Sequence, residues 1–306
     1  MGVPHQSGNF GDLLDPRFQE IYHEQYPMLP DMVPLLYNTA PNNGRNDMRF
    51  SQVGAFEDLT QFDGQVTFDN VTQGFDTTAT AIEWTSGFQV ERALFDDDQY
   101  NIMDQRPRGL ANAVARTRQK HGARAFNNFF TFDTFFFNNS EGVALGSNSH
   151  TTTAQDTSTA SGFDNLVTTA LSATAVASAR IQMVGFRDDR ANRISVVPDE
   201  ILIPPDLYQT AFEIVASMGK VDTANNNRNV HEGAYKIIEW NYLTDTNNWF
   251  MMDSLLRRDA VMWWQRTADE FAFVEDFDTL TGKWRLYTRY SPIVIDWRWG
   301  LGASVS

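Results

Sequence analysis

The chain has 306 residues, of which 42% are hydrophobic, and it carries no cysteine and a formal net charge of −15. This length and apolar content suffice for a folded protein with a sizeable core, while the absence of cysteine excludes disulfides and thiolate metal sites. The excess of acidic residues argues against a protein whose main task is to grip DNA. There is no apolar run of about 18 residues, and the N-terminal MGVPHQSGNFGDLLDP lacks a basic region followed by an apolar one, so neither a membrane partner nor secretion is indicated.

Residues 15–45 are predicted to belong to an extended N-terminal arm. Five prolines between Asp15 and Arg45 disfavour a long regular structure there. Residues 65–91 are predicted to form a projecting β-hairpin, because alternating apolar residues in 65–71 and 81–91 flank a segment rich in Gly, Asp and Thr. An isolated hairpin is marginally stable in water, so this arm should lie on its own chain or on a neighbour.

Charge changes sign abruptly after the hairpin. Residues 55–104 contain eleven acids and one base, whereas 105–132 contain no acid. The candidate contact residues of the acidic loop are Glu57, Asp58, Asp63, Asp69, Asp76 and Glu83. The following segment has the apolar spacing of a long helix, and its basic residues are Arg106, Arg108, Arg116, Arg118, Lys120 and Arg124. At 100° per residue, Arg116 and Lys120 project together, and Arg118 lies about 200° from Arg116.

The second half of the chain reads as an α+β unit. A polar linker up to Ser161 precedes a helix rich in Ala and Thr, for which Ser161 and Asp164 have the spacing of a capping box. The stretch ISVVPDEILIPPDLYQTAFEIVAS predicts two short strands stopped by prolines, and a helix that begins at Pro205. Further strands are predicted at 235–243, 249–253, 283–290 and 293–299.

No motif for catalysis or cofactor binding is present. The sequence lacks a P-loop, a G-x-S-x-G and an H-E-x-x-H, and its five scattered histidines favour packing or surface roles. Asp96–Asp98 lack the spacing of a calcium loop and are interpreted as a solvated turn. We therefore expect no catalytic residues, no cofactor and no metal. The abundant aromatic residues and the paired carboxylates Glu275 and Asp276 leave open a carbohydrate-binding or hydrolytic protein.

Two segments carry a resemblance to a known family. VVPDEILIPPDLYQTAFEIVAS, and NNWFMMD followed by FVEDFDTLTGKWRLYTRYSPIVIDWRW, resemble elements of the major capsid proteins of tailed bacteriophages with the Hong Kong 97 fold. The likeness covers nearly the whole chain and implies an N-terminal arm, an extended loop, a peripheral domain with a spine helix and an axial domain. The implied bounds are 1–52 for the arm, 53–90 for the loop, 91–161 and 249–306 for the peripheral domain with its spine helix at about 105–132, and 162–248 for the axial domain.

The resemblance implies a shell protein and not an enzyme. Such a chain self-assembles through pentamers and hexamers into an icosahedral shell around double-stranded DNA; it is made in the bacterial cytoplasm and ends in the virion. A separate scaffold protein and a portal are expected partners, and a decoration protein remains open. An encapsulin-type cellular compartment of the same fold is the alternative, although the proline-rich arm and the full-length likeness favour a phage.

The resemblance leaves two uses for the basic helix. In the family, the spine helix lies along the shell wall with a surface towards the packaged DNA, and the extended loop lies over a neighbour's peripheral domain. The basic residues are therefore expected to face either DNA phosphates or a neighbour's acidic loop, and we favour the neighbour. Some relatives cross-link a lysine of this loop to an asparagine of another subunit; residues 53–90 contain no lysine here, so a non-covalent shell is expected.

Overall fold

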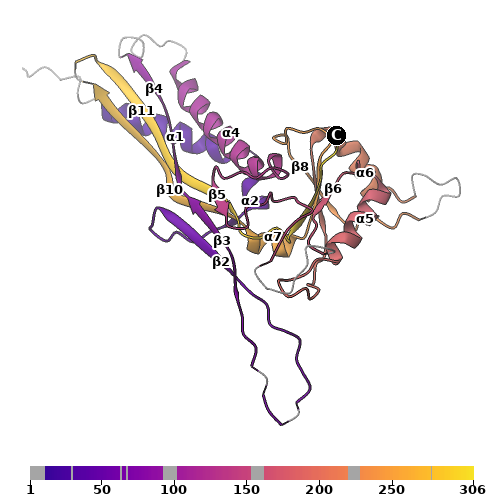
Figure 1. Cartoon of the computed structure of the whole chain (residues 1–306). Helices are drawn as coiled ribbons and strands as arrows, with labels where there is room; N and C mark the ends of the chain where they lie inside the picture. The colour runs from indigo at the N-terminus through magenta and orange to yellow at the C-terminus, as the bar shows by residue number, and fades with distance from the viewer. Residues whose placement is uncertain are drawn as a thin grey trace, which may run out of the picture.

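Three β-sheets, two of them covered by helices, make up the chain in the computed structural model shown in Figure 1. The structure describes residues 11–28, 30–62, 64–66, 68–91, 102–152, 162–219, 228–276 and 278–306. Figure 1 shows an elongated part, a rounder part that carries α5 and α6, and one long loop that projects away from both. Largely antiparallel sheets with separate helices confirm the predicted α+β class.

The elongated part is built on a sheet with the strand order β1-β10-β11-β4. Its strands are β1 (Asn38–Thr39), β4 (Ile82–Glu91), β10 (Val261–Asp276) and β11 (Thr281–Val294). From Trp284 to Tyr290 in β11 every second side chain is buried, as the alternation in the sequence predicts, and residues 291–294 are buried throughout. The strand β10 was not predicted.

Two helices lie along this sheet, α1 (Gly11–Gln25) and α4 (Gln105–Asn127). The predicted spine helix is therefore present, but it ends at Asn127 and not at Phe132; the chain then turns and buries Phe129. The prediction that the N-terminal segment lacks long regular structure is wrong for α1. Phe18 and Tyr22, one turn apart, are buried against the sheet and α4, and four of the five prolines lie beyond the end of this helix.

The rounder part contains a five-stranded sheet in the order β6-β12-β9-β7-β8. Its strands are β6 (Leu166–Val167), β7 (Glu200–Ile203), β8 (Lys236–Glu239), β9 (Trp249–Met252) and β12 (Gly300–Ala303). One face packs against α5 (Ala173–Val184) and α6 (Tyr208–Ala216). Phe250 and Leu202 on the other face join a second core with Phe126 and Phe129 at the end of α4. Because both faces are covered, β7, β9 and β12 are buried throughout.

A small third sheet carries the projecting loop. It consists of β2 (Asp47–Val53), β3 (Gln73–Thr80) and β5 (Phe137–Asn139), and residues 54–72 leave it between β2 and β3 (Figure 1). The predicted pairing of 65–71 with 81–91 is wrong: 81–91 contains β4, which pairs with β11, and the predicted turn contains β3. Thr77 and Ala79 of β3 are fully buried, so small side chains at a buried face, and not turn chemistry, explain that segment.

Three local predictions in the second half also need correction. Ser161 lies outside the described residues, and α5 begins later, where the Ser172 hydroxyl accepts a hydrogen bond from the Ala175 N–H at 3.1 Å. Residues 194–197 form no strand. Of the last predicted strand, 293–299, only the first two residues are in a strand, because β11 ends at Val294 and 295–299 form a turn before β12. Two short connecting helices complete the described fold, α2 (Val33–Leu36) and α7 (Ser254–Ala260), together with the 3-10 turns Tyr26–Met28, Ile102–Asp104 and Pro205–Leu207.

Candidate functional site

The basic residues of α4 fall into two groups in the structure. Arg118 and Arg124 are partly buried and are used inside the chain, whereas the other four are exposed to solvent. Arg118 donates a hydrogen bond of 2.6 Å to the Tyr26 hydroxyl, and its guanidinium lies 5.3 Å from the ring centroid of Trp263, a cation–π distance. The separation of Arg118 from Arg116 agrees with the helical spacing.

Arg124 forms a two-pronged ion pair. Its Nε and one terminal nitrogen donate to the two carboxylate oxygens of Asp133 at 2.7 and 3.0 Å, and its guanidinium lies 4.5 Å from the ring centroid of Phe135. Burial acts to raise the pKa of Asp133, but the hydrogen bonds from Arg124 and Asn128 hold it below its ordinary value. Arg124 therefore fixes the turn that follows α4 and is not free for a partner.

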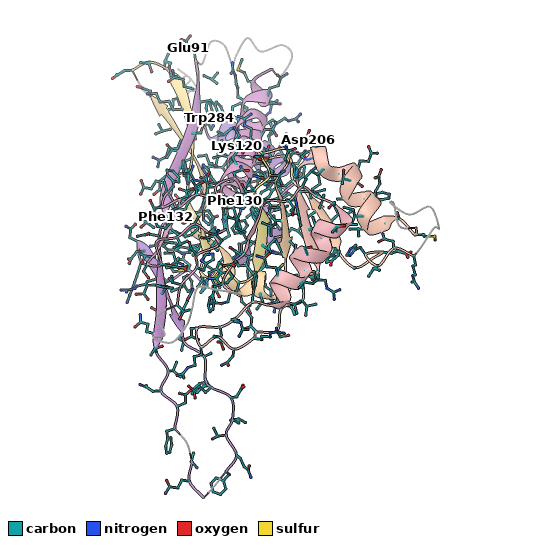
Figure 2. All side chains as sticks on the ribbon, turned by 45° about the vertical axis from the view of Figure 1, so that its right-hand side comes forward. Glu91, Lys120, Phe130, Phe132, Asp206 and Trp284 are labelled. Atoms are coloured by element: carbon teal, nitrogen blue, oxygen red, sulfur yellow. The ribbon has the colours of Figure 1, made fainter. Side chains whose placement is uncertain are left out.

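The remaining basic residues form an exposed surface on α4, which we call the basic face. They make no ion pair within the described part of the chain. The basic face is the set Arg106, Arg108, Arg116 and Lys120, the last of which is labelled in Figure 2. Arg116 and Lys120 project together, whereas Arg106 and Arg108 lie about 200° apart around the helix. Four cations without acidic partners on one helix are available to an external acidic or anionic partner.

Two acids of the projecting loop are held by its own chain. Arg190 contacts the Glu57 carboxylate at 2.7 Å and the Asp69 carboxylate at 3.0 Å. The backbone N–H of Glu57, and then Arg190, keep the pKa of Asp69 below its ordinary value, against a smaller opposing effect of burial. Asp58 is exposed, and Asp63 lies outside the described residues.

The other two candidate acids lie on strands and also have partners in the chain. Asp76 on β3 pairs with Arg49 on the adjacent strand β2, and Glu83 on β4 lies 3.5 Å from Arg289 on β11. These are cross-strand pairs of the kind that support sheets. Five of the six candidate acids are among the described residues. Of these five, only Asp58 makes no ion pair with another described residue of its own chain.

The apolar side chains of the projecting loop form the most conspicuous exposed surface, and they were not among the predicted site residues. They reach into solvent with no cover from the chain, and they are exposed by 67% to 102%. The residues are Val53, Phe56, Leu59, Phe62, Val66 and Phe68. The available signal was the presence of large apolar residues in a segment rich in Gly, Asp and Gln; of these residues, Val66 and Phe68 were predicted to lie on one face of a strand. A monomer rarely exposes such a group of side chains, which is typical of an interaction site.

The carboxylates considered for hydrolysis do not form a catalytic pair. Glu275 is exposed near the end of β10, and Asp276 lies 2.8 Å from the Lys283 ammonium, whose hydrogen bond keeps the pKa of Asp276 below its ordinary value. A general acid of a glycosidase needs a raised pKa instead. Among the described residues, no three His, Asp or Glu side chains are grouped so as to hold a metal, and none of the helices has the length and apolarity needed to cross a bilayer. Asp96–Asp98 lie outside the described residues.

Comparison with solved structures identifies the fold. The mature capsid of bacteriophage PhiM1 matches with a TM-score of 0.60 at 9% identity, over 91% of this chain and 88% of that chain. The capsid of the cyanophage P-SCSP1u matches with a TM-score of 0.54 at 13% identity, over 89% and 86%. A virus-like particle from Pyrococcus furiosus matches with a TM-score of 0.52 at 8% identity, over 94% and 98%. At these identities the likeness shows a shared fold, the Hong Kong 97 fold.

Comparison of the sequence with models of protein families shows which family of this fold the chain matches. No protein of curated function matches the sequence. A model described as phage capsid protein matches residues 74–302, which include α4, all of β4, and every strand of the five-stranded sheet except the last residue of β12. Proteins of this family are structural components of the virion, so the function is that of a shell protein. On the strength of this match and of the fold, the chain belongs to the phage capsid protein family.

Proposed function

We propose that the chain is the repeating subunit of an icosahedral shell that encloses the double-stranded DNA of a tailed phage. The observation that carries this proposal is the projecting loop. Residues 54–72 extend away from the rest of the molecule and expose six apolar side chains, counting Val53 at their root (Figure 1). Such a segment gains stability only when a second molecule covers it. Another copy of the chain is the partner that a closed shell supplies at every loop.

The division into arm, extended loop, peripheral domain and axial domain remains a proposal with the bounds given above. In support of a division into two domains, the elongated part and the rounder part each have their own sheet and their own hydrophobic clusters, although β9 and β12 of the rounder part's sheet come from 249–306. On the rounder part, Tyr208 and Phe212 of α6 lie stacked and about half exposed, with Ile181 of α5 76% exposed. These side chains suit contacts among axial domains within pentamers and hexamers.

We further propose that the basic face of α4 contacts a neighbouring subunit. Most acids of the loop already have partners in their own chain, so the neighbour's exposed Asp58 is the described loop acid that fits this contact. Exposed pairs are worth only about 0–1 kcal/mol each, so the contact would guide assembly more than it would add affinity. Packaged DNA, bound without sequence preference, is the other candidate for this face.

Other partners follow from the role of a shell protein. Assembly in the bacterial cytoplasm with a separate scaffold protein and a portal is proposed, and a decoration protein is a further candidate. The encapsulin-type compartment is the second candidate function, because the Pyrococcus furiosus virus-like particle shares the fold. The match to the phage capsid model favours the phage shell. Nucleic acid extracted from native particles supports the phage shell, and a protein cargo in its place supports the compartment.

The decisive experiment replaces the apolar side chains of the loop. The variant Phe56→Ser/Leu59→Ser/Phe62→Ser/Phe68→Ser should keep the melting temperature of the free subunit, because these side chains are already exposed, and should lose shells in electron micrographs. The matched control is Val274→Ser on β10, which is 63% exposed and should assemble normally. Wild-type protein that stays monomeric in all salt and scaffold conditions would refute the shell function. Normal shells from the quadruple variant would refute the role of the loop.

The basic face is tested separately. Arg116→Glu/Lys120→Glu is compared with Arg285→Glu, an exposed arginine on β11, for the assembly of empty shells across a range of salt concentrations. Loss of empty shells at low salt in the α4 variant alone supports a subunit contact. Normal empty shells with reduced DNA content would assign the face to DNA instead.

A further inference from the structure

One arginine joins the root of the projecting loop to the rounder part of the molecule. Arg190 contacts Glu57 at 2.7 Å on the outgoing half of the loop. On the returning half it contacts Asp69 at 3.0 Å and the Asn70 backbone oxygen. The two halves of the loop also contact each other there, because the Glu57 N–H donates to the Asp69 carboxylate at 2.8 Å. A single planar guanidinium therefore holds both halves of the loop at once.

Arg190 stands on a firmly built turn, residues 187–193. The Asp188 carboxylate accepts from the backbone N–H groups of Arg190 and Asn192 at 2.9 and 2.8 Å, and the Arg187 side chain donates to the Ala191 carbonyl at 2.6 Å. Ala191 has a φ of 64°, a left-handed conformation that costs energy in a residue other than glycine and that the surrounding bonds must maintain. The turn is thus a rigid platform for the guanidinium.

A second contact from this turn reaches the loop next to Arg190. The Asp189 carboxylate accepts from the Ala55 N–H at 2.8 Å, and the adjacent Gly54 N–H donates to the Thr72 carbonyl at 2.9 Å. A Cβ on Gly54 would lie 2.5 Å from the Asp189 carboxylate, so only glycine permits this close approach. The platform and the loop root are therefore fitted to each other.

Hydrophobic packing does not explain how the loop is held. Beneath its root lies a cleft of about 500 Å³, lined by Gly54, Gly74, Asp189, Asp296 and Trp299 among others. Beyond the root, the apolar side chains of the loop are exposed. The direction of the loop relative to the sheets is thus determined by polar contacts above an open cleft, and polar contacts of this kind can be released.

We propose that Arg190 is a positioning residue for assembly: it sets the direction in which the loop leaves the subunit, and so the place where the loop meets a neighbour. The inference rests on the proposed function for its consequence in the shell. Without the guanidinium, no cation would offset the repulsion between the Glu57 and Asp69 carboxylates, and this repulsion would separate the two halves of the loop. A lysine would keep the charge but would lose the fork that reaches both carboxylates.

The test uses the full chain with Arg190→Ala and Arg190→Lys, and with Arg180→Ala on α5 as the matched control. In the free subunit, amide hydrogen exchange at 54–57 and 69–72 should be about tenfold faster in Arg190→Ala, the factor that corresponds to about 1.4 kcal/mol. Arg190→Lys should lie between Arg190→Ala and wild type, and the control should match wild type. Exchange in α4 and in the five-stranded sheet should not change.

Assembly supplies the second measurement. Arg190→Ala should give fewer shells with a broader range of diameters, and Arg190→Lys, which keeps the charge but not the fork, should lie between Arg190→Ala and wild type. Unchanged loop exchange in Arg190→Ala would overturn the inference. Faster exchange together with wild-type shells would overturn its role in assembly. Because the exchange experiment uses free subunits, it decides the role of Arg190 in the loop even if wild-type protein forms no shell and the proposed function fails.

Discussion

A buried ion pair between α7 and β7 gives the sharpest stability prediction. Arg257 and Glu200 are 6% and 4% exposed, and two guanidinium nitrogens of Arg257 lie 2.8 and 3.0 Å from one carboxylate oxygen of Glu200. The third nitrogen donates to the backbone carbonyls of Leu35 and Leu36. Arg257 therefore connects the N-terminal segment to the five-stranded sheet.

The variant Arg257→Met removes this connection without changing the size of the side chain much. It leaves the Glu200 carboxylate buried, with the half-exposed Lys236 ammonium at 3.9 Å as the remaining cation nearby, and it removes the donor to two carbonyls. Loss of one partner of a buried pair costs about 3–5 kcal/mol. In a chain of 306 residues that corresponds to a fall of roughly 5–8 °C in melting temperature.

Thermal unfolding of the free subunit at pH 7, followed by circular dichroism, measures this effect. The double variant Arg257→Met/Glu200→Met should be less destabilised than Arg257→Met alone, because no uncompensated charge remains. The exposed Arg258→Met on the same helix is the matched control and should change the melting temperature little. A loss below about 1 kcal/mol in Arg257→Met, or a double variant less stable than both single variants, would refute the reasoning.

Three further predictions follow from single sites. Burial, and then the nearby cations Arg124 and Lys120, lower the pKa of His121 to about 4. Between about pH 6.5 and pH 4 the unfolded chain therefore binds a proton that the folded chain does not, so the stability of the folded chain should fall as the pH is lowered through this range. In melting experiments at several pH values, His121→Gln should reduce this dependence of stability on pH. Gly302→Ala would place a Cβ 2.8 Å from ring atoms of Phe129, and should cost about 1–3 kcal/mol in denaturant unfolding; a neutral result would mean that the ring moves aside easily. Assembled shells should give one 34.8 kDa band on a denaturing gel, because 53–90 contains no lysine for a cross-link, and a ladder of multimers would contradict this.

The local sequence determined the elements whose signal is contained within one segment. The apolar spacing around Leu110 and Val114 located α4, and the prolines that follow Ile203 located the end of β7 and the helix after it. The alternation from Trp284 to Tyr290 identified the buried face of β11. In each case the period of the pattern and the residues that stop it are sufficient, because they act over a few neighbouring residues. The family resemblance came from the same segments.

Only the tertiary structure decided which segments pair and which side chains remain free. The alternation in 81–91 is correct for a strand, but nothing local states that β11 is its partner, because pairing depends on contacts between residues distant in sequence. Likewise, charge alone did not separate Arg118 and Arg124, which are used inside the chain, from the basic face. Phe68 shows the same limit: its alternation is that of a strand, yet it stays exposed. A strand forms only where the fold supplies a hydrogen-bonded partner strand, and the described residues of 54–72 make only isolated contacts at the root of the loop.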